Sequence, residues 1–146
     1  MTVRLQRATI FVADLDRALS FWRDVLGFEL TYILPPNPDS YSYPVFEVPR
    51  DRVMRFATLS TPSQPRAMAL VELTGAPLPP VPHPRRHAIV LEIADPDAVM
   101  AAARALGLHV YPEEELRTPD GRVGREIGIV DFDDNLVVVY RITSAA

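Results

Sequence analysis

The feature of this chain that most constrains its fold is an internal repeat. In two places an apolar stretch is followed by an aspartate and then by an amphipathic stretch that ends at a glycine. The aspartates are Asp14 and Asp95, which are 95 − 14 = 81 residues apart, and the glycines are Gly27 and Gly107, which are 107 − 27 = 80 residues apart. Aspartate caps helix N-termini and glycine ends helices, so each copy predicts a strand followed by a helix. The spacing indicates that one supersecondary unit occurs twice.

The first copy predicts a βαβββ module over residues 1–74. Its first strand is residues 7–12, which are rich in β-branched and apolar side chains. The helix after Asp14 has apolar residues at the spacing of one helical face, namely Leu15, Ala18, Leu19, Trp22 and Leu26. Three further strands are predicted at residues 28–34, 52–59 and 67–73.

The second copy predicts another βαβββ module over residues 87–146. A stiff linker of residues 75–86, which contains five prolines, separates the two modules. The second module has a strand at 87–93, a helix at 96–106 and strands at 108–111, 125–130 and 136–142, with a less regular strand around Leu116. We therefore expect a single α+β domain, residues 1–146, that is built from two modules.

The composition excludes several classes of function. Fifteen arginines, no lysines and nineteen acidic residues give a formal net charge of −4, so no nucleic acid is expected as a partner. The chain has no cysteine, which excludes disulfides, thiolate metal ligands and cysteine nucleophiles. It has no signal-peptide pattern and no apolar run that is long enough to span a membrane. We expect a cytoplasmic protein with no membrane partner.

A proline-rich loop carries two tyrosines and is followed by a phenylalanine. Residues 35–44, PPNPDSYSYP, cannot continue a sheet ladder because proline lacks the donor N–H. The loop contains Tyr41 and Tyr43, and Phe46 follows it. These rings are candidates to close over a bound ligand. The alternatives are that they pack the loop onto the sheet or face a second subunit.

Four segments of the chain resemble the vicinal oxygen chelate superfamily, which includes glyoxalase I, extradiol dioxygenases, fosfomycin-resistance enzymes and bleomycin-resistance proteins. The segments are VADLDRALSFWRDVLGFEL, MALVELTG, VLEIADPDAVMAAARALGL and IVDFDDNLVVVYRI, whose turn DFDDN resembles the DPDGN-type turn of that superfamily. The resemblance implies that the two modules form a curved mixed sheet around a cavity and that the protein is a homodimer. In many members the cavity holds a divalent metal.

The resemblance also implies where metal ligands would stand, with a histidine or glutamine on the first strand of each module and a glutamate on the last. Counting seven residues back from each cap gives Arg7 and Ala88. The last strands place Glu72 and Val138 at the other two positions. Arginine cannot donate a lone pair to a cation, and alanine and valine side chains have none. The remaining candidate ligands are Glu72 and His87, which stands next to Ala88. Two ligands are fewer than the three or four of a catalytic zinc or iron site.

Strand alternation weakens the case for His87 as a ligand. If Ala88 points into the cavity, Val90 and Glu92 accompany it, and His87 points away unless a bulge turns it back. No metal is therefore favoured. The alternative is one divalent metal (Fe, Mn, Zn or Ni) that is bound by Glu72 and His87.

The same positions suit recognition of an anion. Arg7 is expected either to pair with Glu72 or to bind a ligand carboxylate, phosphate or phenolate, and Thr9 and Val138 are expected among the ligand-binding residues. Arg125 is either a second cationic group of the site or a solvated residue at a strand end. Glu72 is the candidate general base of a metal-free enzyme.

Two classes of function follow from these residues. We expect a protein of the binding or resistance type, with a degenerate metal site, that takes up a small anionic or aromatic molecule in its cavity. The alternative is a lyase, isomerase or dioxygenase of the glyoxalase type, in which a metal polarises substrate oxygens. Whether the chain is an enzyme stays open, because a fold by itself does not determine a chemistry.

Overall fold

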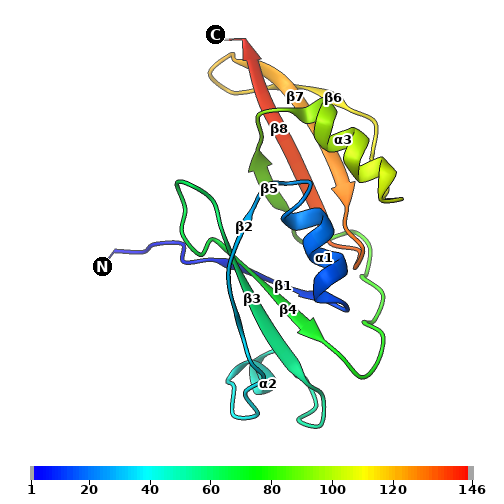
Figure 1. Ribbon diagram of the computed structural model, residues 1–146. Helices are drawn as coiled ribbons and strands as arrows, with labels where there is room; N and C mark the ends of the chain where they lie inside the picture. The colour runs from blue at the N-terminus through cyan, green and yellow to red at the C-terminus, as the bar shows by residue number, and fades with distance from the viewer. Residues whose placement is uncertain (1, 145–146) are drawn as a thin grey trace. The chain divides into compact units, whose positions relative to one another are not determined.

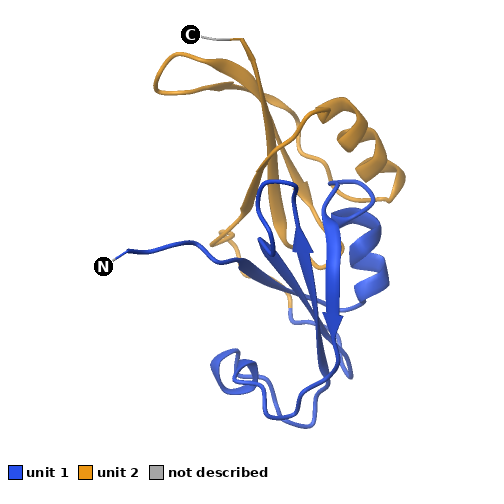
Figure 2. Ribbon diagram, turned by 60° about the vertical axis from the view of Figure 1, so that its left-hand side comes forward, with its two compact units in different colours: residues 1–79 blue, residues 80–146 orange. Residues whose placement is uncertain are grey.

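The computed structural model describes residues 2–144 and divides into two compact units, residues 1–79 and residues 80–146 (Figure 2). The first unit contains β1 (Ala8–Val12), α1 (Leu15–Trp22), β2 (Glu29–Leu34), α2 (Ser42–Val45), β3 (Met54–Ser60) and β4 (Met68–Leu73). The second unit contains β5 (Ile89–Glu92), α3 (Pro96–Ala105), β6 (Glu114–Arg117), β7 (Val123–Val130) and β8 (Leu136–Ser144).

The two units share one sheet topology, which confirms the repeat and the α+β class. The strand order is β1-β4-β3-β2 in the first sheet and β5-β8-β7-β6 in the second. The first strand of each unit is parallel to the last, and the remaining pairs are antiparallel. The strands form two four-stranded sheets rather than one continuous sheet (Figure 1).

The predicted helix caps are present at both places. The carboxylate of Asp14 accepts the Arg17 N–H at 3.0 Å, and that of Asp95 accepts the Ala98 N–H at 3.0 Å. Both closing glycines adopt positive φ, +90° at Gly27 and +79° at Gly107. None of the helices in the described part of the chain is long and apolar enough to cross a membrane.

Each sheet buries one face under its long helix. In the first unit α1 packs against β4 with its buried apolar stripe, while Leu26 lies beyond the end of the helix and is only half-buried. In the second unit α3 packs against β7 and β8. The side chains on that face are almost fully buried, namely Ile127, Ile129, Val137 and Val139. Burial of one such side chain contributes about 1.5–3 kcal/mol, so these faces fix the register of the strands.

Two predictions about local structure are wrong. Residues 108–111 do not form a strand, because they make only an isolated bridge between Val110 and Ile129, and Pro112 then removes the next donor. The strand that follows the helix is β6, around Leu116. The proline-rich stretch is predicted to be a loop throughout, but it contains the one-turn helix α2 (Figure 1). No sequence pattern predicts this helix.

Candidate functional site

Glu72 is a buried carboxylate whose two oxygens are both bonded within the first unit. The residue is 8% exposed and accepts the backbone N–H of Leu15, the first residue of α1, at 2.6 Å. The Arg55 guanidinium on the neighbouring strand β3 donates to it from Nε at 2.7 Å and from Nη2 at 3.2 Å. The Arg55 hydrogen bond lowers the pKa of the Glu72 carboxyl, and the Leu15 N–H lowers it further, although burial opposes both. Through these hydrogen bonds Glu72, on β4, connects its own strand to β3 and to the N-terminus of α1.

Of the two roles that the sequence suggests for Arg7, the ion pair with Glu72 is wrong. In the parallel pairing of β1 with β4, Val12 lies beside Glu72, whereas the Ala8 N–H donates to the carbonyl oxygen of Ala67 at 3.0 Å. Arg7 therefore stands at the opposite end of this strand pair, about 16 Å along the strands from Glu72. Glu72 pairs with Arg55 instead.

The strand register also identifies the counterpart of Val138 in the first unit. Val138 lies beside Val90 in the second unit. The repeat of 81 residues relates Val90 to Thr9, since 90 − 81 = 9, and Thr9 lies beside Ala69. Ala69 is three positions from Glu72, so the two side chains point to opposite faces of the sheet. By register Ala69 is therefore the counterpart of Val138, and Glu72 faces the other side of the sheet.

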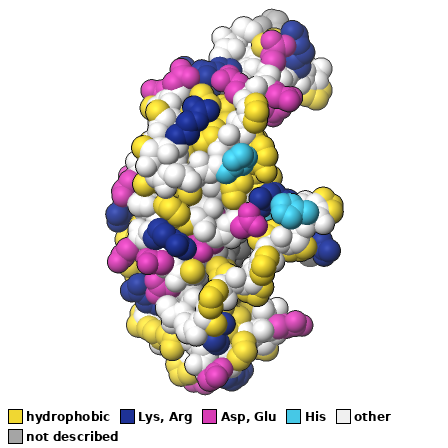
Figure 3. Space-filling model, turned by 90° about the vertical axis from the view of Figure 1, so that its right-hand side faces the viewer, with side chains coloured by type: hydrophobic (Ala, Val, Ile, Leu, Met, Phe, Trp, Pro, Cys, Tyr) yellow, Lys and Arg dark blue, Asp and Glu magenta, His cyan; other side chains and the backbone are white. Residues whose placement is uncertain are grey.

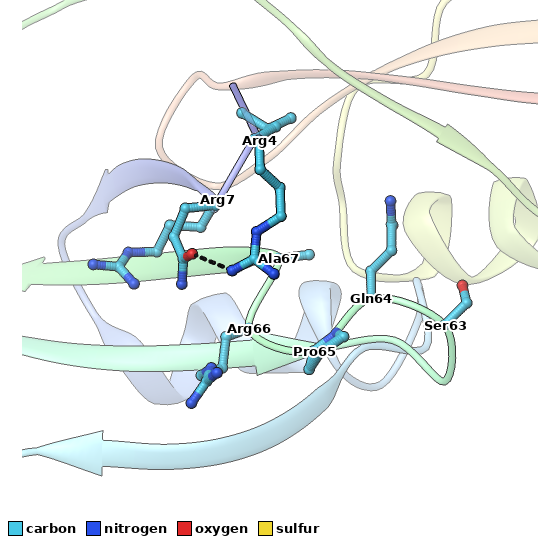
Figure 4. Close-up of a pocket in the computed structure, with 9 residues that line it drawn as sticks. Arg4, Arg7, Ser63, Gln64, Pro65, Arg66 and Ala67 are labelled. Atoms are coloured by element: carbon cyan, nitrogen blue, oxygen red, sulfur yellow. Dashed lines mark hydrogen bonds between the residues drawn. The ribbon is translucent and has the colours of Figure 1, made fainter. Parts of the chain in front are cut away.

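Arg7 lines a hollow of about 260 Å³ at the start of β4, which Figure 4 shows. Arg4 and Gln6 come from the same N-terminal segment, and Arg66 comes from the turn between β3 and β4. An Arg4 Nη2–H donates to Gln6 Oε1 at 3.0 Å. The remaining lining residues are Leu5, Ser63, Gln64, Pro65 and Ala67. We call this group of residues the arginine hollow.

The aromatic residues of the proline-rich loop have different environments. Tyr43 is 4% exposed, packs in a core cluster with Met54, Val71 and Leu73, and donates its O–H to the Arg52 carbonyl at 2.6 Å. The ring of Phe46 contacts that of Phe11 edge-on, with centroids 4.9 Å apart. Tyr41 is 78% exposed. Two of the three rings, those of Tyr43 and Phe46, therefore pack the loop onto the sheet. This packing is one of the alternatives to closing over a ligand.

In the second unit Val138 lies on the face of the sheet opposite α3, which we call the open face. Val90, its neighbour on β5, is 61% exposed. A hollow of about 410 Å³ on this face is lined by Tyr111, Pro112, Glu114, Glu126, Ile127, Gly128 and Val138. Four residues stand side by side across the four strands of this sheet, in the order Glu114, Glu126, Tyr140 and Glu92. The open face therefore combines an apolar hollow with carboxylates, which disfavours an anionic ligand there.

Arg125 belongs to the other face of that sheet. It alternates with the buried Ile127 and Ile129 and reaches the first turn of α3, where its Nη2 donates to Asp97 at 2.7 Å. It also pairs with Glu113 through Nε and Nη2. The Glu113 and Asp97 carboxylates raise the pKa of Arg125, and Arg125 lowers the pKa of both acids. The ion pair with Asp97 thus connects α3 to the sheet. Arg125 lies on the opposite face of the sheet from Val138.

The donors at the candidate metal positions do not fit a metal. His87 is exposed and precedes β5, and Glu72 is already bonded to Arg55 and Leu15. Arg7 and Val138 have no lone pair to donate. Within residues 2–144 there is no group of three or more histidine and carboxylate side chains that is arranged to hold an ion.

With this geometry in place, comparison with known proteins identifies the family. The profile of the Glyoxalase/Bleomycin resistance protein/Dioxygenase superfamily matches residues 4–139. This chain therefore belongs to that superfamily. No curated protein matches the sequence.

Among solved structures, a glyoxalase family protein from Bacillus cereus superimposes with a TM-score of 0.74 at 16% identity, over 99% of this chain and 97% of that chain. The fosfomycin resistance protein FosX from Listeria monocytogenes, complexed with Mn(II) and sulfate, gives a TM-score of 0.62 at 19% identity, over 98% and 95%. A mutant of FosX with Mn(II) and 1S,2S-dihydroxypropylphosphonic acid gives 0.60 at 21% identity, over 98% and 93%. At these identities the likeness shows the fold alone.

Three arginines that matter for the site are absent from the sequence-based candidates. Arg55 lies directly opposite Glu72 in the register of β3 and β4, but that register is visible only in the folded hairpin. Arg4 and Arg66 meet Arg7 because β1 enters the sheet beside the β3–β4 turn. No local sequence pattern carries that information.

Proposed function

We propose that this chain is a binding or resistance-type member of the superfamily, which takes up a small anionic or aromatic molecule without the divalent metal that many relatives use. The observation that carries the proposal is the bonding of Glu72. Its carboxylate oxygens are bonded to Arg55 and to the N-terminus of α1. A metal would have to displace these bonds, and it would leave the guanidinium half-buried without its counterion.

The other ligand positions support the same conclusion. Arg7 carries a permanent positive charge that repels a cation, and the Val138 side chain has no lone pair to donate. What the structure offers instead is a guanidinium in the first unit and, in the second, a hollow whose lining includes Tyr111, Pro112 and Val138. Such surfaces suit an anionic group and an aromatic ring, respectively.

The metal-dependent lyase, isomerase or dioxygenase is the alternative outcome of the test. FosX has been crystallised with Mn(II), so a divalent metal is the cofactor to try. Here that enzyme would have to recruit Glu72 away from Arg55 and use the exposed His87.

The experiment is a titration of small ligands into protein that has been dialysed against a chelator. Benzyl alcohol, benzoate and inorganic phosphate are titrated by calorimetry, first with excess EDTA and then with added Mn(II). We expect at least one of these probes to bind in EDTA, with an affinity that Mn(II) does not change. Binding that requires Mn(II), or no binding of any probe, would contradict the proposal.

We also propose a homodimer. The edge strand β2 presents a run of exposed apolar side chains, Tyr32, Ile33 and Leu34. An apolar edge of this kind favours pairing with another copy of the chain. Sedimentation should give the mass of two chains for the wild type and of one chain for Leu34→Asp, and a wild-type monomer would exclude the proposal.

A further inference from the structure

The arginine hollow is a built feature of the first unit, because two separate segments are held against each other there. The Ala8 N–H donates to the Ala67 carbonyl oxygen at 3.0 Å, and this bond ties the N-terminal segment to the end of the β3–β4 turn. The segment contributes Arg4 and Arg7, and the turn contributes Arg66 (Figure 4). Backbone structure therefore holds the two segments that bring these three arginines to one hollow.

The turn that carries Arg66 is held in place by hydrogen bonds. Thr61 and Gln64 exchange backbone bonds at 3.0 and 3.3 Å. The Arg66 N–H donates to Ser60 Oγ at 2.7 Å, and that hydroxyl bonds to Thr31 Oγ1 at 2.6 Å. Arg66 itself adopts a φ of +57°, in the left-handed region of backbone conformation that residues other than glycine seldom occupy. A non-glycine residue that is held in this conformation is a reason to look for function at the turn.

The charge of the hollow is not balanced by nearby acids. By contrast, Arg55, Arg85 and Arg125 each pair with a carboxylate. On the face drawn in Figure 3, basic and acidic side chains lie beside one another at several places. No carboxylate lines the arginine hollow, and among residues 2–144 no ion pair engages its three arginines. Three arginines that line one hollow with no carboxylate among the lining residues make it a region of positive charge, which attracts an anion.

We propose that the arginine hollow binds a tetrahedral oxyanion, which is the phosphate or phosphonate group of a small molecule. This inference rests on the proposed function and names the anionic group. A phosphate or phosphonate dianion carries more charge and more acceptor oxygens than a carboxylate, which a single arginine can satisfy, so it suits a hollow that three arginines line. Ser63 and Gln64, whose side chains are neutral donors, also line the hollow. The volume of about 260 Å³ holds an anionic head group and leaves the rest of the ligand outside the hollow.

The test is calorimetric titration of chelator-treated protein with inorganic phosphate, methylphosphonate and acetate. We expect one phosphate per chain, weakened about tenfold or more by Arg7→Gln and by Arg66→Gln, because each change removes a charge-assisted hydrogen bond. Arg104→Gln is the matched control, because it removes the same charge from an exposed position on α3. Arg66→Gly removes the guanidinium with a residue that tolerates the positive φ, so it separates loss of binding from distortion of the turn.

The outcomes separate this inference from the proposed function. Equal phosphate affinities in Arg7→Gln, Arg66→Gln and Arg104→Gln would overturn the inference, as would acetate binding as tightly as phosphate. If benzyl alcohol binds in EDTA while phosphate does not, the inference fails and the proposed function stands. If phosphate binds only after Mn(II) is added, the proposed function fails as well. Tighter binding of methylphosphonate than of phosphate would support the inference and favour a phosphonate over a phosphate ester as the ligand.

Discussion

Replacement of Glu72 by glutamine tests whether this carboxylate stabilises the fold of the first unit. Glu72 accepts hydrogen bonds from the Leu15 N–H and from two nitrogens of Arg55. Glutamine has nearly the same shape but only one acceptor oxygen, and its amide N–H₂ would face a donor. One of the two partners therefore loses its acceptor, and the guanidinium of Arg55 loses its counterion.

The size of the effect follows from the contacts. A hydrogen bond that involves a charged group contributes about 1.5–3 kcal/mol, and the low end applies here because the Arg55 side chain is 38% exposed and water compensates part of the loss. A negative charge at the N-terminus of a helix contributes about 0.3–1 kcal/mol more. We therefore expect Glu72→Gln to lower the free energy of unfolding by about 2 kcal/mol at pH 7.

The assay is urea unfolding of wild type and Glu72→Gln at several pH values, with the exposed Glu29→Gln as control. The pKa of Glu72 is lowered in the folded state, so the stabilisation is complete above the unfolded carboxyl pKa of about 4.3 and is lost as the pH falls through the folded value. The difference between wild type and variant should therefore shrink in acid. The reasoning is refuted if the difference at pH 7 is no larger than for Glu29→Gln, or if it is unchanged at pH 3.

Three further predictions concern other parts of the chain. Tyr43→Phe removes the buried bond to the Arg52 carbonyl and should lower the free energy of unfolding by about 1 kcal/mol in urea titrations; an unchanged midpoint would contradict the packed loop. Arg125→Gln should lower the melting temperature slightly at low salt and have no effect in 1 M NaCl, because the exposed carboxylates of Asp97 and Glu113 are screened; a loss that persists in salt would mean that packing is involved. Ala88→His combined with Val138→Glu adds two metal donors to the second unit and should create weak Mn(II) binding by calorimetry, which the wild type should lack; no gain would mean that the lack of donors is not what prevents metal binding.

Local signals in the sequence predicted the framework well. The caps at Asp14 and Asp95 and the glycines that follow each helix depend on neighbours within a few residues, so their spacing revealed the repeat. The alternation rule also held on β5, where Val90 is exposed and the neighbouring Leu91 is less so. The strand at residues 108–111 failed because apolar composition alone does not reveal where the sheet ladder continues.

The partners of the site residues were harder to predict, because they depend on how distant strands align. Glu72 and Arg55 are 17 residues apart and meet only through the register of β3 and β4. Arg125 is different, because the signal was present in the sequence. Its alternation with Ile127 and Ile129 places it on the helix-covered face, and applying the strand period to residues 125–130 would have removed it from the ligand candidates.

The most direct test of the central claim is elemental analysis of metal in protein that has been purified without a chelator and without a nickel affinity tag. If the ligand is bound without a metal, the protein should retain far less than one divalent ion per chain after dialysis, and His87→Ala should not differ from wild type. About one ion per chain in the wild type, lost in His87→Ala, would contradict the account and direct the search to substrates of a metal-dependent enzyme.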